Sequence, residues 1–169
     1  MSWPDDVHRE LKAAAVRMVG YVPDAGHKRL IELCQADKTM RAVVLSTEEE
    51  GIGLAVGAWL GGQRCALLMQ SSGVGNIINV LGTVQVCRFP LLIVVTMRGE
   101  EGEFNPWQVP MGRATPQVLE AMGMRVQRAS ASGEIAPLVA AALKGDEATA
   151  VLISQSVIGI KSFQEQRSQ

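Results

Sequence analysis

The sequence predicts an α/β fold, a three-layer doubly wound parallel sheet with helices on both of its faces. Short apolar segments alternate with segments of helical periodicity along the chain. The segment 91–95 is β-branched and apolar without alternation, which is typical of a strand covered on both faces. In such a sheet the crossovers are right-handed, and ligand sites lie at the carboxyl ends of the strands.

The elements follow in order from the start of the chain. Pro4 and Asp5 are typical of a helix start, and apolar residues then recur at helical spacing to about Arg17. Asp24 follows a short strand and is expected to cap the next helix, whose apolar residues lie within 30–34. The expected strands are 19–22, 42–45, 66–69, 91–95, 124–127 and 150–154. The later helices are expected at 48–60, 76–86, 116–122 and 134–143.

Residues 97–115 form a long stretch that is rich in glycine and proline and shows neither a helical nor a strand pattern. A loop of this length in a compact domain usually has a function. Together with the position of ligand sites in parallel sheets, this makes the loops after residues 45, 69 and 95 the candidate sites.

Composition restricts the classes of function. The chain has 169 residues, of which 47% are hydrophobic and 20% charged, and this size fits one domain, which we place at 1–163, followed by a polar tail at 164–169. The net charge of -1, with both signs mixed, gives no footprint for nucleic acid or an anionic membrane. No apolar run approaches the roughly 20 residues that span a bilayer, and the N-terminus lacks the pattern of a signal peptide. We therefore expect a cytoplasmic protein.

The three cysteines are Cys34, Cys65 and Cys87. They are odd in number and widely spaced, and each lies in an apolar stretch. This pattern predicts reduced core thiols rather than disulfides or a zinc site.

The segment 70–76, Gln-Ser-Ser-Gly-Val-Gly-Asn, places small residues between a strand and a helix, a pattern that can bind phosphate. It lacks the lysine of a Walker loop, and Ile78 stands where a dinucleotide fingerprint needs its third glycine. The chain has no Gly-x-Ser-x-Gly elbow, and its histidines are His8 and His27. A nucleophilic serine is therefore not expected.

Three consecutive acids, Glu48 to Glu50, open the helix predicted at 48–60. Thr47 and Glu50 form the capping-box pattern, and acids in a first turn suit the helix dipole. Three glycines inside this helix cost roughly 1 kcal/mol each relative to alanine. Something is therefore expected to pack closely against the helix, either another helix or a cofactor ring.

Together these segments resemble the pyrimidine-binding domain of thiamine-diphosphate enzymes, and within it the sulfopyruvate and phosphonopyruvate decarboxylase family. The resemblance covers nearly the whole chain. It rests on the helix from Glu48 to Gly57 and on the segments 21–26, 69–76 and 97–112. The spacing to Gly57 selects Glu48 from the three acids.

The resemblance implies the thiamine-diphosphate-binding (pyrimidine-domain) fold and a subunit that decarboxylates a 3-substituted pyruvate. The preferred reaction is 3-sulfopyruvate to sulfoacetaldehyde and CO2, with phosphonopyruvate or another 2-oxo acid as the alternative substrate. Glu48 would be the catalytic residue, bonded to a pyrimidine nitrogen of thiamine diphosphate, and this role requires Glu48 to be buried. The implied cofactor-binding residues are Glu48, Ser72, Gly73, Val74, Gly75 and Asn76.

The resemblance also implies a partner chain. Family members bind Mg²⁺ and the diphosphate through a Gly-Asp-Gly motif followed by an asparagine. Here Gly145-Asp146-Glu147 lacks the second glycine, and no asparagine follows it. We therefore expect no metal ligands in this chain and a hetero-oligomer in which a beta subunit binds Mg²⁺ and the diphosphate.

A sulfonate or phosphonate on a small 2-oxo acid needs cationic or polar partners, because burying an unpaired anion is costly. The candidate substrate-binding residues are Asp24, His27, Arg98, Gln108 and Arg113. His27 could instead be an ordinary first-turn residue, Gln108 could bond the loop backbone, and Arg98 could pair with Glu100, Glu101 or Glu103. For the whole chain, the alternative is a non-catalytic flavodoxin-like binding module.

Overall fold

The computed structural model describes residues 2–159 of the chain. Its strands are β1 (Val16–Tyr21), β2 (Arg41–Val44), β3 (Arg64–Gln70), β4 (Leu92–Thr96), β5 (Arg125–Ala129) and β6 (Thr149–Ile153). Its helices are α1 (Trp3–Ala13), α2 (Lys28–Ala36), α3 (Glu48–Leu60), α4 (Ser71–Ile77), α5 (Leu81–Cys87), α6 (Gln108–Ala121), α7 (Ser132–Lys144) and α8 (Gln155–Ile158).

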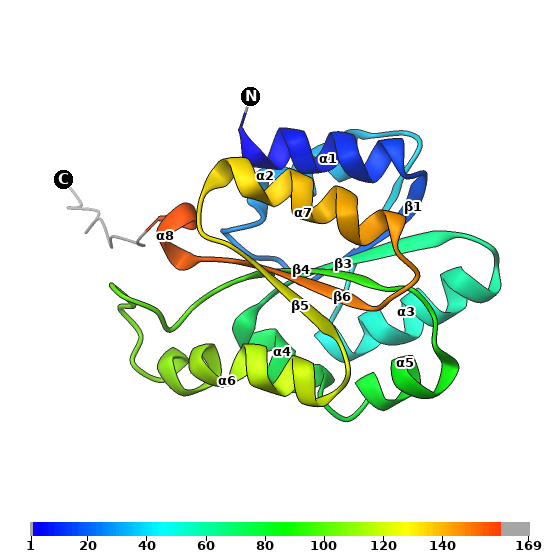
Figure 1. The fold of residues 1–169 in the computed structure, drawn as a ribbon. Coiled ribbons are helices and arrows are strands. Elements are labelled where there is room, and N and C mark those ends of the chain that lie inside the picture. The colour runs from blue at the N-terminus through cyan, green and yellow to red at the C-terminus, as the bar shows by residue number, and fades with distance from the viewer. Residues whose placement is uncertain (1, 160–169) are drawn as a thin grey trace.

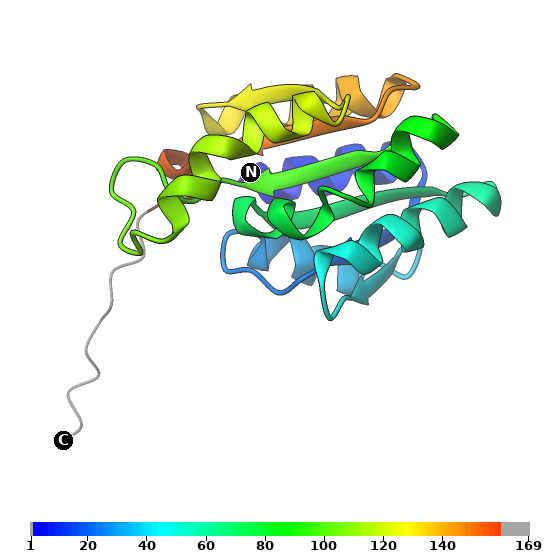
Figure 2. The same ribbon diagram turned by 90° about the horizontal axis from the view of Figure 1, so that it is seen from below.

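The six strands form one sheet in the order β2-β1-β3-β4-β6-β5, and every neighbouring pair is parallel. Helices α1, α2 and α7 cover one face of the sheet, and α3, α4, α5 and α6 cover the other (Figures 1 and 2). The prediction of a three-layer, doubly wound parallel sheet is confirmed.

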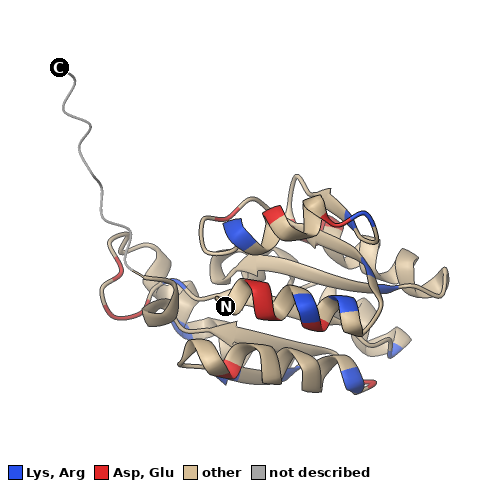
Figure 3. Ribbon diagram, turned by 90° about the horizontal axis from the view of Figure 1, so that it is seen from above, with Lys and Arg blue, Asp and Glu red and all other residues tan. Residues whose placement is uncertain are grey.

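The inner strands β4 and β6 are buried on both faces of the sheet, whereas the edge strands β2 and β5 are only partly buried. All five residues of β4 and all five of β6 are buried, as expected for strands between two helical layers. Along β3, Leu68 belongs to the apolar core beneath α1 and α7, whereas Leu67 and Met69 belong to the core beneath α3 and α4. Acidic and basic residues are mixed over the outer side of the α1, α2 and α7 layer (Figure 3).

The first helix is shorter than predicted, and the first strand begins earlier. Helix α1 ends at Ala13, not near Arg17, because Ala15 adopts a left-handed φ of 57° that stops the helical ladder. The chain then enters β1 at Val16. The predicted strand at 19–22 is therefore the second half of a longer strand.

Two predicted loops are largely helical. Residues 71–77 form α4, and the single helix predicted at 76–86 is in fact two helices, α4 and α5. The second half of the stretch 97–115 is the start of α6, which begins at Gln108. Pro116 was expected to begin a helix and instead lies inside α6, where it removes the hydrogen bond that its N–H would give to the Gly112 carbonyl. Periodicity was hidden in both regions by glycine and proline.

The cysteines are all free. Cys34 is buried and Cys65 is half-buried, and burial raises the pKa of each thiol to about 12. Cys87, at the end of α5, is exposed, so the expectation of a core thiol is wrong for this residue.

The chain order places a topological switch point between β1 and β3. From β1 the chain passes to β2 on one side, whereas β3 leads to β4 on the other side. Ligand sites of open α/β sheets lie at the carboxyl ends of the strands at such a point. Within residues 2–159, no helix is long and apolar enough to cross a membrane. The predicted tail at 164–169 and the domain end at 163 lie outside the described residues.

Candidate functional site

Glu48 begins α3 and is buried, with 8% of its surface exposed. Thr47 precedes it in an extended conformation, which turns the chain from β2 into the helix. The Asn76 side chain, from α4, donates from Nδ2 to Glu48 Oε2 at 2.8 Å. The burial predicted for Glu48 is confirmed, and its carboxylate is fixed between two helices at the carboxyl edge of the sheet.

Gly73 is the reason that Glu48 can lie where it does. A Cβ at Gly73 would stand 2.3 Å from Glu48 Oε1 and 2.5 Å from Glu48 Cδ, so no larger residue fits without displacing the carboxylate. The backbone of α4 therefore covers one side of the Glu48 side chain. Helices α3 and α4, which are separate in the sequence, meet at this contact.

The other members of the predicted segment 72–76 have different surroundings. The Val74 side chain is fully buried in the core, and a Cβ at Gly75 would meet Met111 Sδ at 3.4 Å. Ser72 donates from Oγ to Gln70 Oε1 at 3.3 Å. Gly73 and Asn76 thus contact Glu48 directly, and the cofactor-binding role of the whole segment stays a prediction.

The predicted capping box is not formed, because Glu50 bonds the backbone of Ser46, one residue before the N-cap Thr47. Glu50 Oε2 accepts a hydrogen bond from the backbone N–H of Ser46 at 2.9 Å, and the Thr47 side chain makes no capping hydrogen bond. Glu49 is exposed. Each acid of the triplet has its own surroundings, and Glu48 alone is buried among them.

The glycines of α3 face two ways. A Cβ at Gly51 would approach the side chains of Leu45 and Leu67 to 3.1 Å, so this glycine lets the helix pack tightly on the sheet. Gly53 and Gly57 are exposed, and apart from adjacent residues and the backbone of α3 itself, no atom of the described residues lies within 4 Å of the Cβ that either would carry. A close approach is found at Gly51, where the neighbours are Leu45 and Leu67 rather than the expected helix or ring, and the backbone at the two outer glycines is uncovered.

Asp24 lies at the switch point rather than at a helix cap, so its predicted capping role is wrong. Its Oδ1 accepts a hydrogen bond from Gln70 Nε2, its Oδ2 accepts one from Thr96 Oγ1 at 2.7 Å, and His27 Nδ1 lies 3.5 Å from Oδ2. Burial opposes ionisation of Asp24, but the contacts with His27, Thr96 and Gln70 outweigh it and hold the pKa well below its usual range. The last residues of β3 and β4, together with His27 before α2, thus meet at one buried carboxylate.

His27 occupies the position before α2 and is completely buried. Its ring lies edge-on to Trp3, with 6.3 Å between ring centroids. Neither ring nitrogen reaches a hydrogen-bond partner among residues 2–159, and the 3.5 Å approach of Nδ1 to Asp24 is its nearest polar contact with an acid. His27 is therefore a core residue behind Asp24, not a first-turn surface residue.

A hollow of about 130 Å³ opens beside Asp24 at the carboxyl edge of the sheet. It is lined by Asp24, Ala25, Gly26, Thr96, Met97, Arg98, Gln155, Ile158 and Gly159. Of the predicted substrate residues, Asp24 and Arg98 line this hollow. Sequence reasoning missed Thr96 and Gln155, because each looked like an ordinary residue at the end of a strand.

Arg98 pairs with Glu103 through two parallel hydrogen bonds of 2.8 and 2.6 Å, which confirms the pairing that the sequence left open. Glu103 also accepts hydrogen bonds from the backbone N–H groups of Gly99 and Asn105 and from Gln155 Nε2. Chiefly because of Arg98, the pKa of Glu103 falls to about 2. The loop is thus folded back on an ionised, almost fully buried carboxylate.

Gln108 and Arg113 lie on α6, away from the residues that line the hollow. The Gln108 carbonyl packs against Gly99, where a Cβ would stand only 2.3 Å away. Gln108 is half-buried, and Arg113 is exposed. The structure therefore does not bring these two side chains into the Asp24 and Arg98 cluster.

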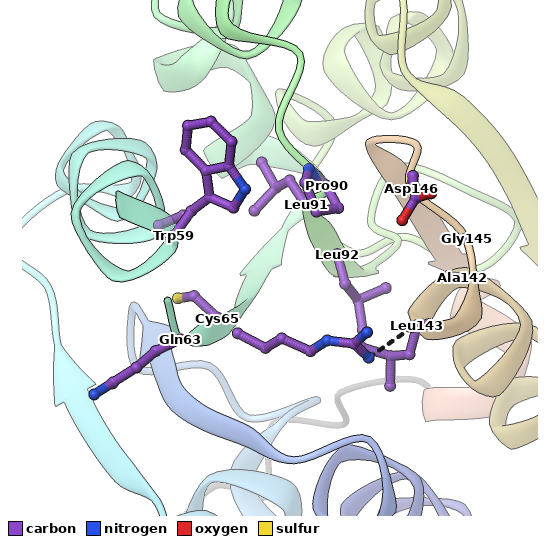
Figure 4. Close-up of a pocket in the computed structure, with 12 residues that line it drawn as sticks. Trp59, Gln63, Cys65, Pro90, Leu91, Leu92, Ala142, Leu143, Gly145 and Asp146 are labelled. Atoms are coloured by element: carbon purple, nitrogen blue, oxygen red, sulfur yellow. Dashed lines mark hydrogen bonds between the residues drawn. The ribbon is translucent and has the colours of Figure 1, made fainter. Parts of the chain in front are cut away.

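A second hollow, of about 60 Å³, lies at the opposite, amino edge of the sheet (Figure 4). Trp59, Cys65, Leu91 and Leu143 contribute to its mainly apolar wall, and Arg64 crosses it to donate to the Leu143 carbonyl at 2.9 Å. Parallel sheets bind ligands at the carboxyl edge. We therefore assign the candidate site to the edge that carries Glu48 and Asp24.

No group of three or more His, Cys, Asp or Glu side chains within residues 2–159 is arranged to hold a metal ion. The acids at the carboxyl edge are instead bonded to donors from the protein itself. The site can therefore offer a fixed carboxylate at Glu48 and a polar hollow beside Asp24.

Comparison with known proteins gives consistent matches. Residues 1–105 match the family model described as thiamine pyrophosphate enzyme, N-terminal TPP binding domain. The chain is 37% identical over 155 residues to sulfopyruvate decarboxylase subunit alpha of Methanothermobacter thermautotrophicus, with 89% of this chain and 94% of that protein covered. It is 33% identical over 121 residues to phosphonopyruvate decarboxylase of Streptomyces viridochromogenes, with 70% and 30% covered.

The fold also matches a solved structure, the 2-oxoglutarate:ferredoxin oxidoreductase of Magnetococcus marinus. The TM-score is 0.71 at 12% sequence identity, with 98% of this chain and 34% of that chain covered. At this identity the likeness supports the fold alone.

Proposed function

The chain belongs to the thiamine pyrophosphate enzyme family, and from this premise we propose that it is the alpha subunit of a decarboxylase that converts 3-sulfopyruvate to sulfoacetaldehyde and CO2. The observation that carries the proposal is the buried carboxylate of Glu48, held by Asn76 at the start of α3. A non-catalytic module would have no use for an acid buried at this position.

The residues around Glu48 fit a bound pyrimidine ring. Asn76 donates a hydrogen bond to Glu48 Oε2, and the carboxylate is shielded from bulk water. Because Gly73 has no side chain, Glu48 Oε1 can lie against the backbone of α4. When bound, thiamine diphosphate supplies the electron sink for decarboxylation. Glu48 holds or shares a proton at the ring nitrogen, and Gly73 and Asn76 keep the carboxyl group in place for it.

The substrate lies in the hollow beside Asp24 in this proposal. Arg98 faces its anionic substituent, Asp24 orders the polar network, and His27 supports Asp24 from the core. Gln108 and Arg113, on α6, would contribute only at the outer rim of the site. Phosphonopyruvate is the alternative substrate, because relatives named phosphonopyruvate decarboxylase also match the chain.

The proposal requires a second subunit. Relatives that match most of this chain are named as alpha subunits. A beta subunit that binds the diphosphate and Mg²⁺ would complete the active site. The bare backbone of Gly53 and Gly57, on the helix that begins with Glu48, is accessible to such a partner. A cytoplasmic location also stays a proposal.

The test is to co-express the chain with a candidate beta chain that carries the Gly-Asp-Gly motif and to measure CO2 release from 3-sulfopyruvate with thiamine diphosphate and Mg²⁺. We expect Glu48→Gln to lower kcat by about 100-fold or more, because positioned acid–base catalysis contributes about 10²–10⁴-fold. Glu49→Gln changes the exposed neighbouring acid and should keep the wild-type rate. A complex that forms without releasing CO2, or a fully active Glu48→Gln complex, contradicts the proposal.

A further inference from the structure

The Arg98 guanidinium is fixed along one edge and open along the other. Its Nε and Nη2 donate to the two oxygens of Glu103, while no hydrogen bond joins Nη1 to any residue within 2–159. The Arg98 side chain keeps 11% of its surface exposed, and it lines the hollow that Asp24 also lines. A planar guanidinium held in this way presents its remaining N–H groups in one set direction.

The Glu103 carboxylate is held in place by donors other than Arg98. Gln155 Nε2 and the Gly99 N–H donate to it at 3.0 Å each, and its side chain is 1% exposed. The Arg98 backbone is also wedged in place, since a Cβ at Gly112 would stand 2.1 Å from the Arg98 carbonyl oxygen. The direction of the free guanidinium edge is thus determined by the fold.

The hollow is not strongly cationic. Glu103 compensates the charge of Arg98, and the ionised Asp24 adds a negative charge among the residues that line the hollow. The pKa shifts agree with this balance, because hydrogen bonds to Glu103 raise the pKa of Arg98 while that of Asp24 is lowered. His27 faces Asp24 from the core and does not line the hollow.

This balance discriminates between two anions. A sulfonate carries one negative charge, whereas a phosphonate, like a phosphate monoester, carries roughly -1.5 to -2 at pH 7. A single guanidinium edge can satisfy a monoanion. A second negative charge would be placed near Asp24 and Glu103 without a compensating cation, which is unfavourable at a partly buried site.

We propose that Arg98 is the specificity-determining residue that binds the anionic 3-substituent of the substrate, and that Glu103 is its positioning residue, which makes the hollow favour a sulfonate over a phosphonate. This inference rests on the proposed function and narrows its substrate. It also explains why the loop 97–107 carries a buried ion pair beside the hollow.

The test measures kcat and KM of the alpha–beta complex for 3-sulfopyruvate and for phosphonopyruvate. We expect Arg98→Gln to raise the KM for 3-sulfopyruvate by about 10-fold to 100-fold with a smaller change in kcat, as for the loss of a hydrogen bond to a charged group. Arg98→Lys keeps the charge without the fork and should recover part of the loss. Glu103→Gln removes a negative charge, so the preference for sulfonate over phosphonate in kcat/KM should fall by about fivefold or more.

Glu147→Gln is the matched control, because it breaks an exposed ion pair with Arg125 near the amino edge of the sheet and should leave the preference unchanged. General loss of structure lowers turnover of both substrates alike, so the ratio separates specificity from stability. Circular dichroism and co-purification with the beta chain verify that each variant folds and assembles.

The outcomes are distinguishable. A wild-type complex that turns over neither substrate overturns the proposed function itself. A wild-type complex that prefers phosphonopyruvate, or an Arg98→Gln complex with wild-type KM, overturns only the inference about Arg98. If the Glu103→Gln variant assembles and its preference for sulfonate is unchanged, the positioning role of Glu103 is overturned. If that variant does not assemble, the Arg98→Lys variant decides instead. A wild-type KM for Arg98→Lys would show that binding does not need the fork geometry that Glu103 is proposed to hold.

Discussion

Asn76 Nδ2 donates a hydrogen bond of 2.8 Å to Glu48 Oε2, and this bond joins the end of α4 to the start of α3. It uses one carboxylate oxygen, while the other lies against Gly73. A glutamate side chain has several rotamers, and holding one of them costs conformational entropy that the fixed donor offsets. The acid is therefore oriented before any cofactor binds.

Removal of this donor should reduce catalysis more than stability. We expect Asn76→Ala to lower the kcat of the alpha–beta complex by about tenfold, because a hydrogen bond to a charged group contributes about 1.5–3 kcal/mol at most. Asn76 is itself exposed, so its truncation leaves no cavity. The control is Asn79→Ala, which truncates a second exposed asparagine three residues further along the chain. Equal kcat values for the two variants would contradict the orienting role.

Glu103 should make the fold sensitive to acid. Its hydrogen bonds to Arg98 hold its pKa at about 2 in the folded chain, against roughly 4.3 when unfolded. A lowered folded-state pKa stabilises the fold above about pH 4.3, and this stabilisation is lost as the pH falls toward 2. Glu103→Gln should therefore flatten the dependence of the free energy of unfolding on pH in this window.

Urea denaturation at successive pH values measures this difference. Asp24 also has a lowered pKa, but it titrates in both proteins, so the comparison isolates Glu103. An equally steep loss of stability in the variant would show that the Arg98 pair does not contribute.

The cysteines should differ in reactivity. Cys87 is exposed, whereas burial raises the pKa of Cys34 and Cys65 to about 12 and keeps both thiols protonated at neutral pH. We expect a chromogenic disulfide reagent to modify one thiol quickly in the native chain and the other two only after unfolding. Cys87→Ser should abolish the fast phase, and a fast phase that persists would place the reactive thiol elsewhere.

The sequence predicts the centre of the sheet well, because β4 and β6 are buried on both faces and therefore form almost continuous apolar runs. The helix 48–60 is predicted to the residue, since acids mark its start and Gly61 and Gly62 its end. Helix α4 is not predicted, because Gly73 and Gly75 are typical of loops. Only the tertiary contact with Glu48 explains why a glycine belongs inside a helix there.

The site shows the same division. Glu48 could be found through the family resemblance and its spacing to Gly57, and Gly73 and Asn76 through the segment 69–76 that carries the same resemblance. Gln155 could not be found from the sequence, because it is a single glutamine that follows the last strand. Its role depends on Glu103, in a loop more than 50 residues earlier. Long-range hydrogen bonds of this kind leave no periodic trace in a sequence.

The contact between Gly73 and Glu48 gives a direct test of the site geometry. In the Gly73→Ala chain the new Cβ would stand 2.3 Å from Glu48 Oε1, so either the carboxylate or α4 must move, which we expect to cost about 1–3 kcal/mol of unfolding free energy. Glu48→Ala removes every atom of that clash, so Gly73→Ala should cost at least 1 kcal/mol less in the Glu48→Ala background. Gly53→Ala, at an open position of α3, is the control and should be neutral or slightly stabilising. Urea denaturation of the four chains of the cycle gives the coupling energy. Strict additivity would contradict the contact between the Glu48 side chain and Gly73, and with it the arrangement of the carboxylate that the proposed function requires.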